Sequence, residues 1–237
     1  MLQTAIILAG GFGTRLQKVV SNLPKPMAPV NGDPFLNYQL KYLKHFGIKR
    51  IIFSVGYLAE KIQDYYKTNF KGLEITYVTE DIPLGTGGGI RLGMEQCEDD
   101  FALVLNGDSF FDVDIHAFFK LHINERAQFS LALRNVKNAS RYGTIETDDN
   151  DRIISFKEKT NTEKEGRING GTYILNKELY LKNTPPGSNF SIEKDVFEQQ
   201  LENLIIKGFE FSAYFIDIGI PEDYLKAQDD LKGFTYR

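Results

Sequence analysis

Short apolar runs alternate in the first half of the chain with segments in which apolar residues recur every three or four positions. The short runs predict buried strands, and the spaced pattern predicts amphipathic helices. This alternation is typical of a mostly parallel sheet that helices cover on both faces. We therefore expect a Rossmann-like α/β fold. The expected strands span 6–8, 51–55, 74–79 and 101–105. Helices are expected over 33–46, with Asp33 as the N-cap, over 58–70, and from the second glycine cluster to about Gln96.

The second half of the chain has a different pattern, in which short strands are joined by polar turns. Strands expected over 129–134, 143–147 and 152–156 are separated as in antiparallel hairpins. Another strand is expected to open at Gly170 and a last one to end at Asp217. Since no linker of disordered composition separates the halves, we expect one domain over 1–237, divided at 110/111, with a small antiparallel lobe in the second half.

The first strand runs directly into a glycine-rich turn that contains Gly10, Gly11 and Gly13. Successive backbone N–H groups in such a turn form a concavity that binds anions. Arg15 follows, and Lys25 lies ten residues further on between two prolines. A planar guanidinium fork and a compact ammonium suit phosphate oxygens. The loop therefore predicts a polyphosphate site.

Two better-known phosphate loops do not fit this turn. A P-loop requires a Lys directly after its last glycine, and none occurs here. The dinucleotide fingerprint requires a third glycine where this chain has Leu16. A dehydrogenase is therefore disfavoured.

Carboxylates follow two apolar strands at what should be the ligand-binding edge of the sheet. Asp108 comes after the strand 101–105, and Asp217 lies between two isoleucines. Magnesium prefers oxygen ligands and often shares them with substrate phosphates. We expect Asp108 and Asp217 to form a Mg²⁺ site, with Asp112 a weaker metal candidate and Asp114 a helix N-cap.

The composition limits which binding partners and which cellular compartment we expect for the protein. A net charge of −4 lacks the basic footprint of a nucleic-acid or membrane-surface binder. The single cysteine, Cys97, cannot form an intrachain disulfide, and the chain starts without a signal-peptide pattern. We expect a cytoplasmic protein with no nucleic-acid or membrane partner; a homo-oligomer is compatible with the sequence. The three histidines do not cluster in the sequence, and we expect them to have packing or surface roles.

The glycine loop LAGGFGTRL together with Pro24-Lys25-Pro26 resembles the signature of the sugar nucleotidyltransferases, or nucleoside-diphosphate-sugar pyrophosphorylases. The segments 106–108 and 217–221 are similar to its metal motifs, with Ile220 in place of the usual Thr, and Phe156–Lys159 is similar to its sugar-phosphate element. Directly after Thr14-Arg15-Leu16, where the family often has a basic residue, this chain has Gln17. The resemblance extends from Leu2 to about Gln228.

This resemblance implies a role for each matching residue. The segment 1–110 would bind a nucleoside triphosphate and 111–237 a sugar 1-phosphate, with Mg²⁺ at Asp108 and Asp217. Helix capping is an equally good explanation for Glu193. The implied catalytic residues are Arg15 and Lys25; the nucleotide-binding residues are Leu8, Ala9, Gly10, Gly11, Gly13, Thr14, Glu80, Gly85, Thr86, Asn106 and Gly107; the sugar-phosphate residues are Tyr142, Gly143, Glu158, Lys159, Asn169, Gly170 and Glu193.

The segments LGTGGGI, LNGDSFFDVDI, INGGTYIL and FIDIGIPEDY resemble the family's guanylyltransferases for D-glycero-α-D-manno-heptose 1-phosphate. GTP would then be the nucleotide, and GDP-heptose for surface polysaccharide the product. Glu80 favours guanine, because a carboxylate can accept a paired hydrogen bond from its two neighbouring donors. Two alternatives stay open: a uridylyltransferase acting on N-acetylmuramic acid 1-phosphate or a hexose 1-phosphate, and a non-catalytic nucleotide-sugar-binding subunit.

Overall fold

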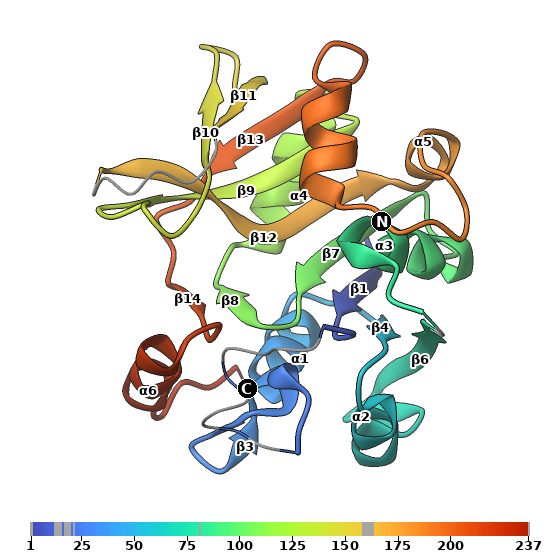
Figure 1. Cartoon of the computed structure of the whole chain (residues 1–237), viewed down its shortest axis with the longest axis vertical. Coiled ribbons are helices and arrows are strands. Elements are labelled where there is room, and N and C mark those ends of the chain that lie inside the picture. The colour runs from blue at the N-terminus through green and yellow to red at the C-terminus, as the bar shows by residue number, and fades with distance from the viewer. Residues whose placement is uncertain are drawn as a thin grey trace.

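A mixed sheet runs through the computed structural model, which describes residues 2–11, 16, 20, 22–80, 82–157 and 164–236 (Figure 1). Its order is β11-β10-β12-β7-β1-β4-β6-β5, with β9 between β12 and β13. β1 pairs in parallel with β4 and β7, and β4 pairs in parallel with β6, which confirms the expected parallel core. The strands are β1 (Thr4–Leu8), β4 (Arg50–Val55), β5 (Asn69–Phe70), β6 (Leu73–Thr79), β7 (Phe101–Asn106), β9 (Phe129–Val136), β10 (Thr144–Thr147), β11 (Ile153–Lys157), β12 (Gly166–Asn176) and β13 (Ile206–Glu210).

Helices cover both faces of the sheet. Successive side chains of a strand point to opposite faces, so each buried strand contributes to the core on both sides. Ile7 of β1 belongs to the core under α1 (Phe35–His45), α2 (Ala59–Tyr66) and α4 (Ile115–Asn124). Ile6 belongs to the core under α3 (Gly85–Gln96), α5 (Lys177–Lys182) and the π-helix η2 (Ile192–Phe197). The remaining elements are short or terminal: η1 (Lys25–Met27), β2 (Pro29–Val30), β3 (Asp33–Pro34), β8 (Ser109–Phe111), η3 (Glu198–Gln200), β14 (Phe215–Asp217) and α6 (Pro221–Asp230).

Two helix boundaries differ from the sequence-based expectation. Asp33 does not cap α1: it pairs with Val30 in the β2–β3 ladder, and its carboxylate accepts a hydrogen bond from Lys41 at 3.2 Å. Pro34 is the N-cap and offers no side-chain bond. The second helix stops at Tyr66 because Lys67 takes a φ of +52°, which is outside the helical region.

The hairpin β10–β11 is antiparallel, as expected, but β12 begins at Gly166 rather than Gly170. Its register shifts between Asn169 and Tyr173. Gly171 lies in this irregularity with a φ of +67°, a value that favours glycine. The two glycines therefore mark a bulge inside a strand, not its beginning.

The N-cap expected at Asp114 is confirmed, and two other helices in the second half begin with a serine cap and a proline. Asp114 Oδ1 accepts the Ala117 N–H at 2.9 Å, and Ser191 Oγ accepts the Lys194 N–H at 3.3 Å. Pro221 is the first residue of α6. Among the described residues, no helix is long and apolar enough to cross a membrane.

Candidate active site

A cavity of about 330 Å³ opens where β1 and β7 end and α3 begins; we call it the strand-end cavity. Every described residue of the predicted nucleotide set lines it, and so do Pro26 and Pro83. Gly13, Thr14 and Arg15 lie outside the described residues. The lining residues from the predicted set are Leu8, Ala9, Gly10, Gly11, Glu80, Gly85, Thr86, Asn106 and Gly107.

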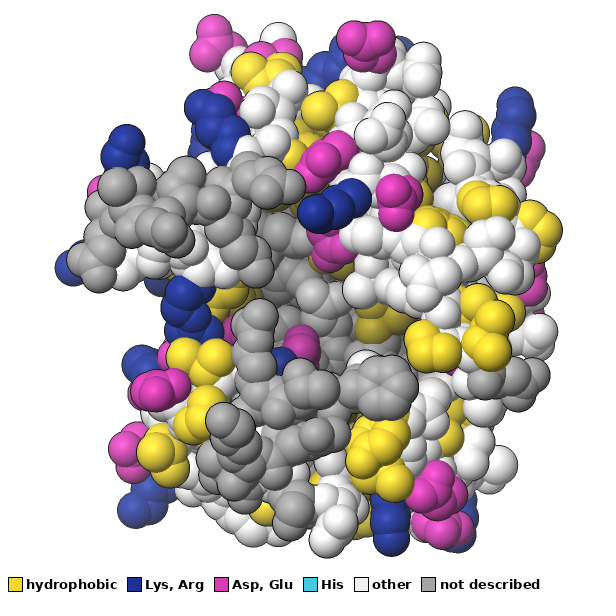
Figure 2. All heavy atoms as spheres, viewed as in Figure 1, with side chains coloured by type: hydrophobic (Ala, Val, Ile, Leu, Met, Phe, Trp, Pro, Cys, Tyr) yellow, Lys and Arg dark blue, Asp and Glu magenta, His cyan; other side chains and the backbone are white. Residues whose placement is uncertain are grey.

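A second cavity of about 290 Å³, the lobe cavity, adjoins the first and shares Asn106 and Asp108 with it. Figure 2 shows this face of the molecule hollowed near its centre, with acidic and basic side chains at the hollow. Glu158 and Lys159 lie outside the described residues. The lobe cavity is lined by the predicted residues Tyr142, Gly143, Asn169, Gly170 and Glu193, by Gly171 next to them and by Asp217, and by the unpredicted Ser109 and Phe215.

Lys25 and the two predicted metal carboxylates come together where the cavities meet. The Lys25 Nζ atom lies 2.5 Å from Asp108 Oδ2 and 3.6 Å from Asp217 Oδ1. The pairing of β14 with β8 sets Asp217 opposite Ser109, one residue beyond Asp108. Burial, together with the charge of Asp108, raises the pKa of the Asp217 carboxyl. Opposite charges from segments far apart in the sequence thus converge on one point.

The residues present fit a divalent cation. One ammonium group already faces both carboxylates, so a single cation can contact Asp108 and Asp217 together. In the part of the chain that the structure describes, no cluster of three or more His, Cys, Asp or Glu residues could hold a metal. Two carboxylates are nevertheless a usual protein contribution to Mg²⁺, which takes further oxygens from phosphates and water. The weaker candidate, Asp112, lines neither cavity.

Gln39 of α1, whose side chain is fully buried, hydrogen-bonds the turn that carries Asp108. Its Nε2 donates to the Asn106 carbonyl at 2.8 Å and to the Ser109 carbonyl at 2.6 Å. Gly107 is needed in the same turn, since a Cβ there would lie 2.5 Å from the Leu8 carbonyl oxygen. Sequence reasoning missed Gln39, because a glutamine within an amphipathic helix carries no motif signal.

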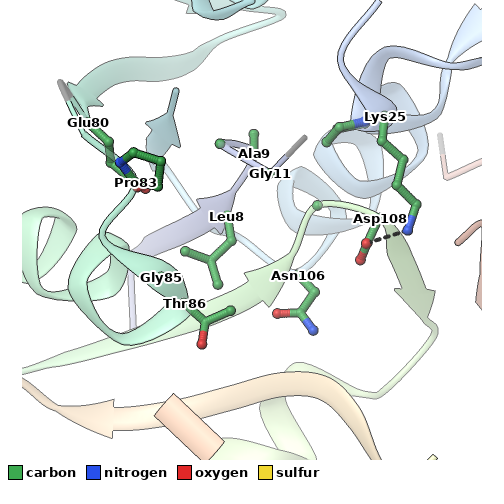
Figure 3. Close-up of a pocket in the computed structure, with 13 residues that line it drawn as sticks. Leu8, Ala9, Gly11, Lys25, Glu80, Pro83, Gly85, Thr86, Asn106 and Asp108 are labelled. Atoms are coloured by element: carbon green, nitrogen blue, oxygen red, sulfur yellow. Dashed lines mark hydrogen bonds and ion pairs between the residues drawn. The ribbon is translucent and has the colours of Figure 1, made fainter. Parts of the chain in front are cut away.

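Glu80 lies on the opposite side of the strand-end cavity from Lys25 and Asp108 (Figure 3). Its Oε1 accepts a hydrogen bond from the Ser54 hydroxyl at 3.0 Å, and its Oε2 accepts the Leu84 N–H at 2.8 Å. The carboxylate is therefore held in one orientation at the cavity wall.

Glu193 connects the two cavities through Thr86. Its Oε2 accepts hydrogen bonds from the Thr86 hydroxyl at 3.2 Å and the Ser191 hydroxyl at 2.9 Å. Its Oε1 accepts from the Tyr173 hydroxyl at 3.3 Å. The carboxylate is thus satisfied by side chains while it lines the lobe cavity, and the cap of η2 comes from Ser191.

The histidines and the cysteine lie away from both cavities, as the sequence indicated. His122 is fully buried beside Ser130, and burial lowers its pKa to about 4. Burial raises the pKa of the Cys97 thiol, so that it stays protonated and unreactive.

The chain matches the nucleotidyl transferase family model over residues 4–233. It belongs to this family, as the glycine loop and the paired carboxylates indicate.

Two relatives place the chain more narrowly within the family. It is 45% identical over 230 residues to a D-glycero-α-D-manno-heptose 1-phosphate guanylyltransferase of Aneurinibacillus thermoaerophilus, covering 97% of this chain and 99% of the relative. The enzyme of the same name from Campylobacter jejuni is 44% identical over 93% of this chain and 96% of its own length. The crystal structure of HddC from Yersinia pseudotuberculosis superposes with a TM-score of 0.86 at 35% identity, covering 97% of this chain and 100% of that one; HddC has also been solved with GMP-PN.

Proposed function

We propose that this protein transfers the guanylyl group of GTP to D-glycero-α-D-manno-heptose 1-phosphate and releases pyrophosphate. The observation that carries the proposal is the junction of two cavities at Asp108, with Lys25 and Asp217 beside it. The likeness to two heptose 1-phosphate guanylyltransferases supports the choice of substrates. The product, GDP-heptose, would serve the synthesis of a surface polysaccharide.

The reaction requires positioning and charge neutralisation more than proton transfer. An oxygen of the sugar phosphate forms a bond to the α-phosphorus of GTP, and the bond from that phosphorus to the bridging oxygen of pyrophosphate breaks. A phosphomonoester carries nearly two negative charges at neutral pH because its second pKa is about 6. The attacking oxygen therefore needs no general base. Arg15 and Lys25 would hold the triphosphate, and Lys159 the sugar phosphate.

The proposed metal is Mg²⁺, held by Asp108 and Asp217. When bound, it neutralises charge on the phosphates during transfer. Lys25, which is only 12% exposed, contributes a cation at the same junction. We place the triphosphate across the strand-end cavity, with its phosphates toward Lys25 and its base toward Glu80.

Glu80 is the proposed reader of the base. Guanine presents a ring N–H beside an amino group, and an oriented carboxylate can accept both in a paired hydrogen bond. Uracil presents one donor between two carbonyl oxygens, one of which would face the same carboxylate. The fixed orientation of Glu80 therefore favours a guanylyltransferase over a uridylyltransferase.

We further propose that residues 1–237 act as one catalytic unit, with the nucleotide half spanning 1–110 and the sugar-phosphate half 111–237. The lobe-cavity residues Tyr142, Gly143, Asn169, Gly170 and Glu193 would surround the sugar. Because both substrates are phosphorylated metabolites, we place the reaction in the cytoplasm.

A pyrophosphate-release assay with GTP and a panel of sugar 1-phosphates tests the proposal. The heptose 1-phosphate should give the highest kcat/KM, and chelation of divalent metal should abolish release. A higher kcat/KM for a hexose 1-phosphate or N-acetylmuramic acid 1-phosphate would reject the heptose assignment. Absence of release with every sugar would favour a non-catalytic binding subunit.

A further inference from the structure

We infer that Ser54 is a positioning residue for base specificity, acting through Glu80 rather than on the substrate; the inference rests on the proposed reading of guanine by Glu80. Ser54 is the next-to-last residue of β4, and its side chain is fully buried. Its hydroxyl donates to Glu80 Oε1 at 3.0 Å. A buried hydroxyl needs a partner, and here the partner is a carboxylate at a cavity wall.

Among the residues that the structure describes, one donor bonds each oxygen of Glu80. Ser54 bonds Oε1, and the Leu84 N–H bonds Oε2 at 2.8 Å. Each carboxylate oxygen has about two lone-pair positions, so one position on each oxygen remains. A paired hydrogen bond from the two parallel donors of guanine needs one position on each oxygen.

Two glycines allow the carboxylate to sit in this place. A Cβ at Gly10 would lie 3.1 Å from Glu80 Oε1, and a Cβ at Gly89 would lie 2.8 Å from the same atom. The carboxylate is thus packed between the end of β1 and α3, with Ser54 fixing its rotation. Loss of the Ser54 hydroxyl would leave one anchor, at Oε2, around which the carboxylate could pivot.

The nucleotide pair GTP and ITP isolates this effect. Hypoxanthine keeps the ring N–H of guanine but lacks the amino group, so it can use only one oxygen of the carboxylate. An oriented carboxylate distinguishes the two bases through the second hydrogen bond, whereas a pivoting one distinguishes them poorly. Removal of Ser54 should therefore bring the use of GTP closer to that of ITP.

The experiment compares kcat/KM for GTP and ITP in the wild type, Ser54→Ala and Ser130→Ala. Ser130 is a matched control, since it is also a fully buried strand serine, bonded to His122 away from both cavities. Ser54→Ala should lower the GTP/ITP ratio by about tenfold or more, the scale of one hydrogen bond to a charged group. Ser130→Ala should leave the ratio unchanged. Ser54→Cys, with a weak donor of similar size, should give an intermediate ratio and provides a second variant if Ser54→Ala does not fold.

Different results reject different claims. A wild-type preference for GTP over ITP that persists in Ser54→Ala and Ser54→Cys would overturn the role of Ser54 and leave the reading by Glu80 intact. An equal fall of the ratio in Ser130→Ala would also overturn it, because the effect would then be general. Equal use of GTP and ITP by the wild type would reject the guanine reading itself and the role of Ser54 with it.

Discussion

Replacing Lys25 by Met should increase the affinity of the nucleotide-free protein for a divalent cation. Lys25 Nζ lies 2.5 Å from one proposed metal ligand and 3.6 Å from the other, so it competes with a metal for both carboxylates. At 3.6 Å, a pair of unit charges interacts by about 1 kcal/mol in water and about 5 kcal/mol at an effective dielectric constant of 20. The carboxylates of Asp108 and Asp217 are 38% and 25% exposed. Solvent therefore screens the charges, and the gain in metal-binding free energy should lie nearer about 1 than about 5 kcal/mol.

We therefore expect Mn²⁺ to bind Lys25→Met about 5- to 30-fold more tightly than the wild type, which corresponds to about 1–2 kcal/mol. Isothermal titration of the nucleotide-free protein with Mn²⁺ measures this directly. Lys41→Met is the matched control, since Lys41 pairs with Asp33 outside both cavities and should leave Mn²⁺ affinity unchanged. Unchanged or weaker Mn²⁺ binding by Lys25→Met would refute the view that Lys25 and the metal share these carboxylates.

Three further predictions follow from the same contacts. Asp217→Asn should lower kcat by about two orders of magnitude or more, or at least about 3 kcal/mol of transition-state stabilisation, in a Mg²⁺-saturated assay; near-normal turnover would remove Asp217 from the site. Gln39→Met should reduce the free energy of unfolding by about 1–3 kcal/mol in urea, because the buried carbonyl of Ser109 and the half-buried carbonyl of Asn106 lose their donor; an unchanged value would contradict the proposed clamp. Because burial lowers the pKa of His122 to about 4 from 6.5, the unfolded chain binds the proton more readily, and stability should fall by about 2 kcal/mol as the pH drops from 7 to 5; His122→Gln should remove most of that dependence in denaturation curves.

The sequence predicted the features that depend on local patterns. Alternating apolar runs and amphipathic segments predicted the parallel strands, since burial on both faces determines that pattern. The glycine loop and the strand-end carboxylates predicted a ligand site at the carboxyl ends of the parallel strands, because these ends lie at one edge of the sheet. The individual residues that line the cavities were mostly implied by the family resemblance. Asp217 was predicted from its position in an apolar strand end, but that strand, β14, lies outside the main sheet, and its pairing with β8 brings Asp217 next to Asp108.

Features that depend on tertiary contacts were missed or misread. Asp33 resembles a helix cap in the sequence, but in the structure it pairs with Val30 between β2 and β3. Gly170 and Gly171 look like the opening of a strand, whereas they form an irregularity within β12. Gln39 and Ser54 carry no motif, since their importance comes from the carbonyls and the carboxylate that the fold brings to them.

Direct competition between two nucleotides tests the central claim. The protein would receive equimolar GTP and UTP with Mg²⁺ and limiting D-glycero-α-D-manno-heptose 1-phosphate, and mass spectrometry would quantify the two nucleotide-heptose products. We expect GDP-heptose to dominate in the wild type and the excess over UDP-heptose to shrink in Glu80→Gln, whose amide presents a donor where guanine needs an acceptor. UDP-heptose as the main product of the wild type, or the same product ratio from Glu80→Gln, would contradict the assignment of Glu80 as the reader of guanine.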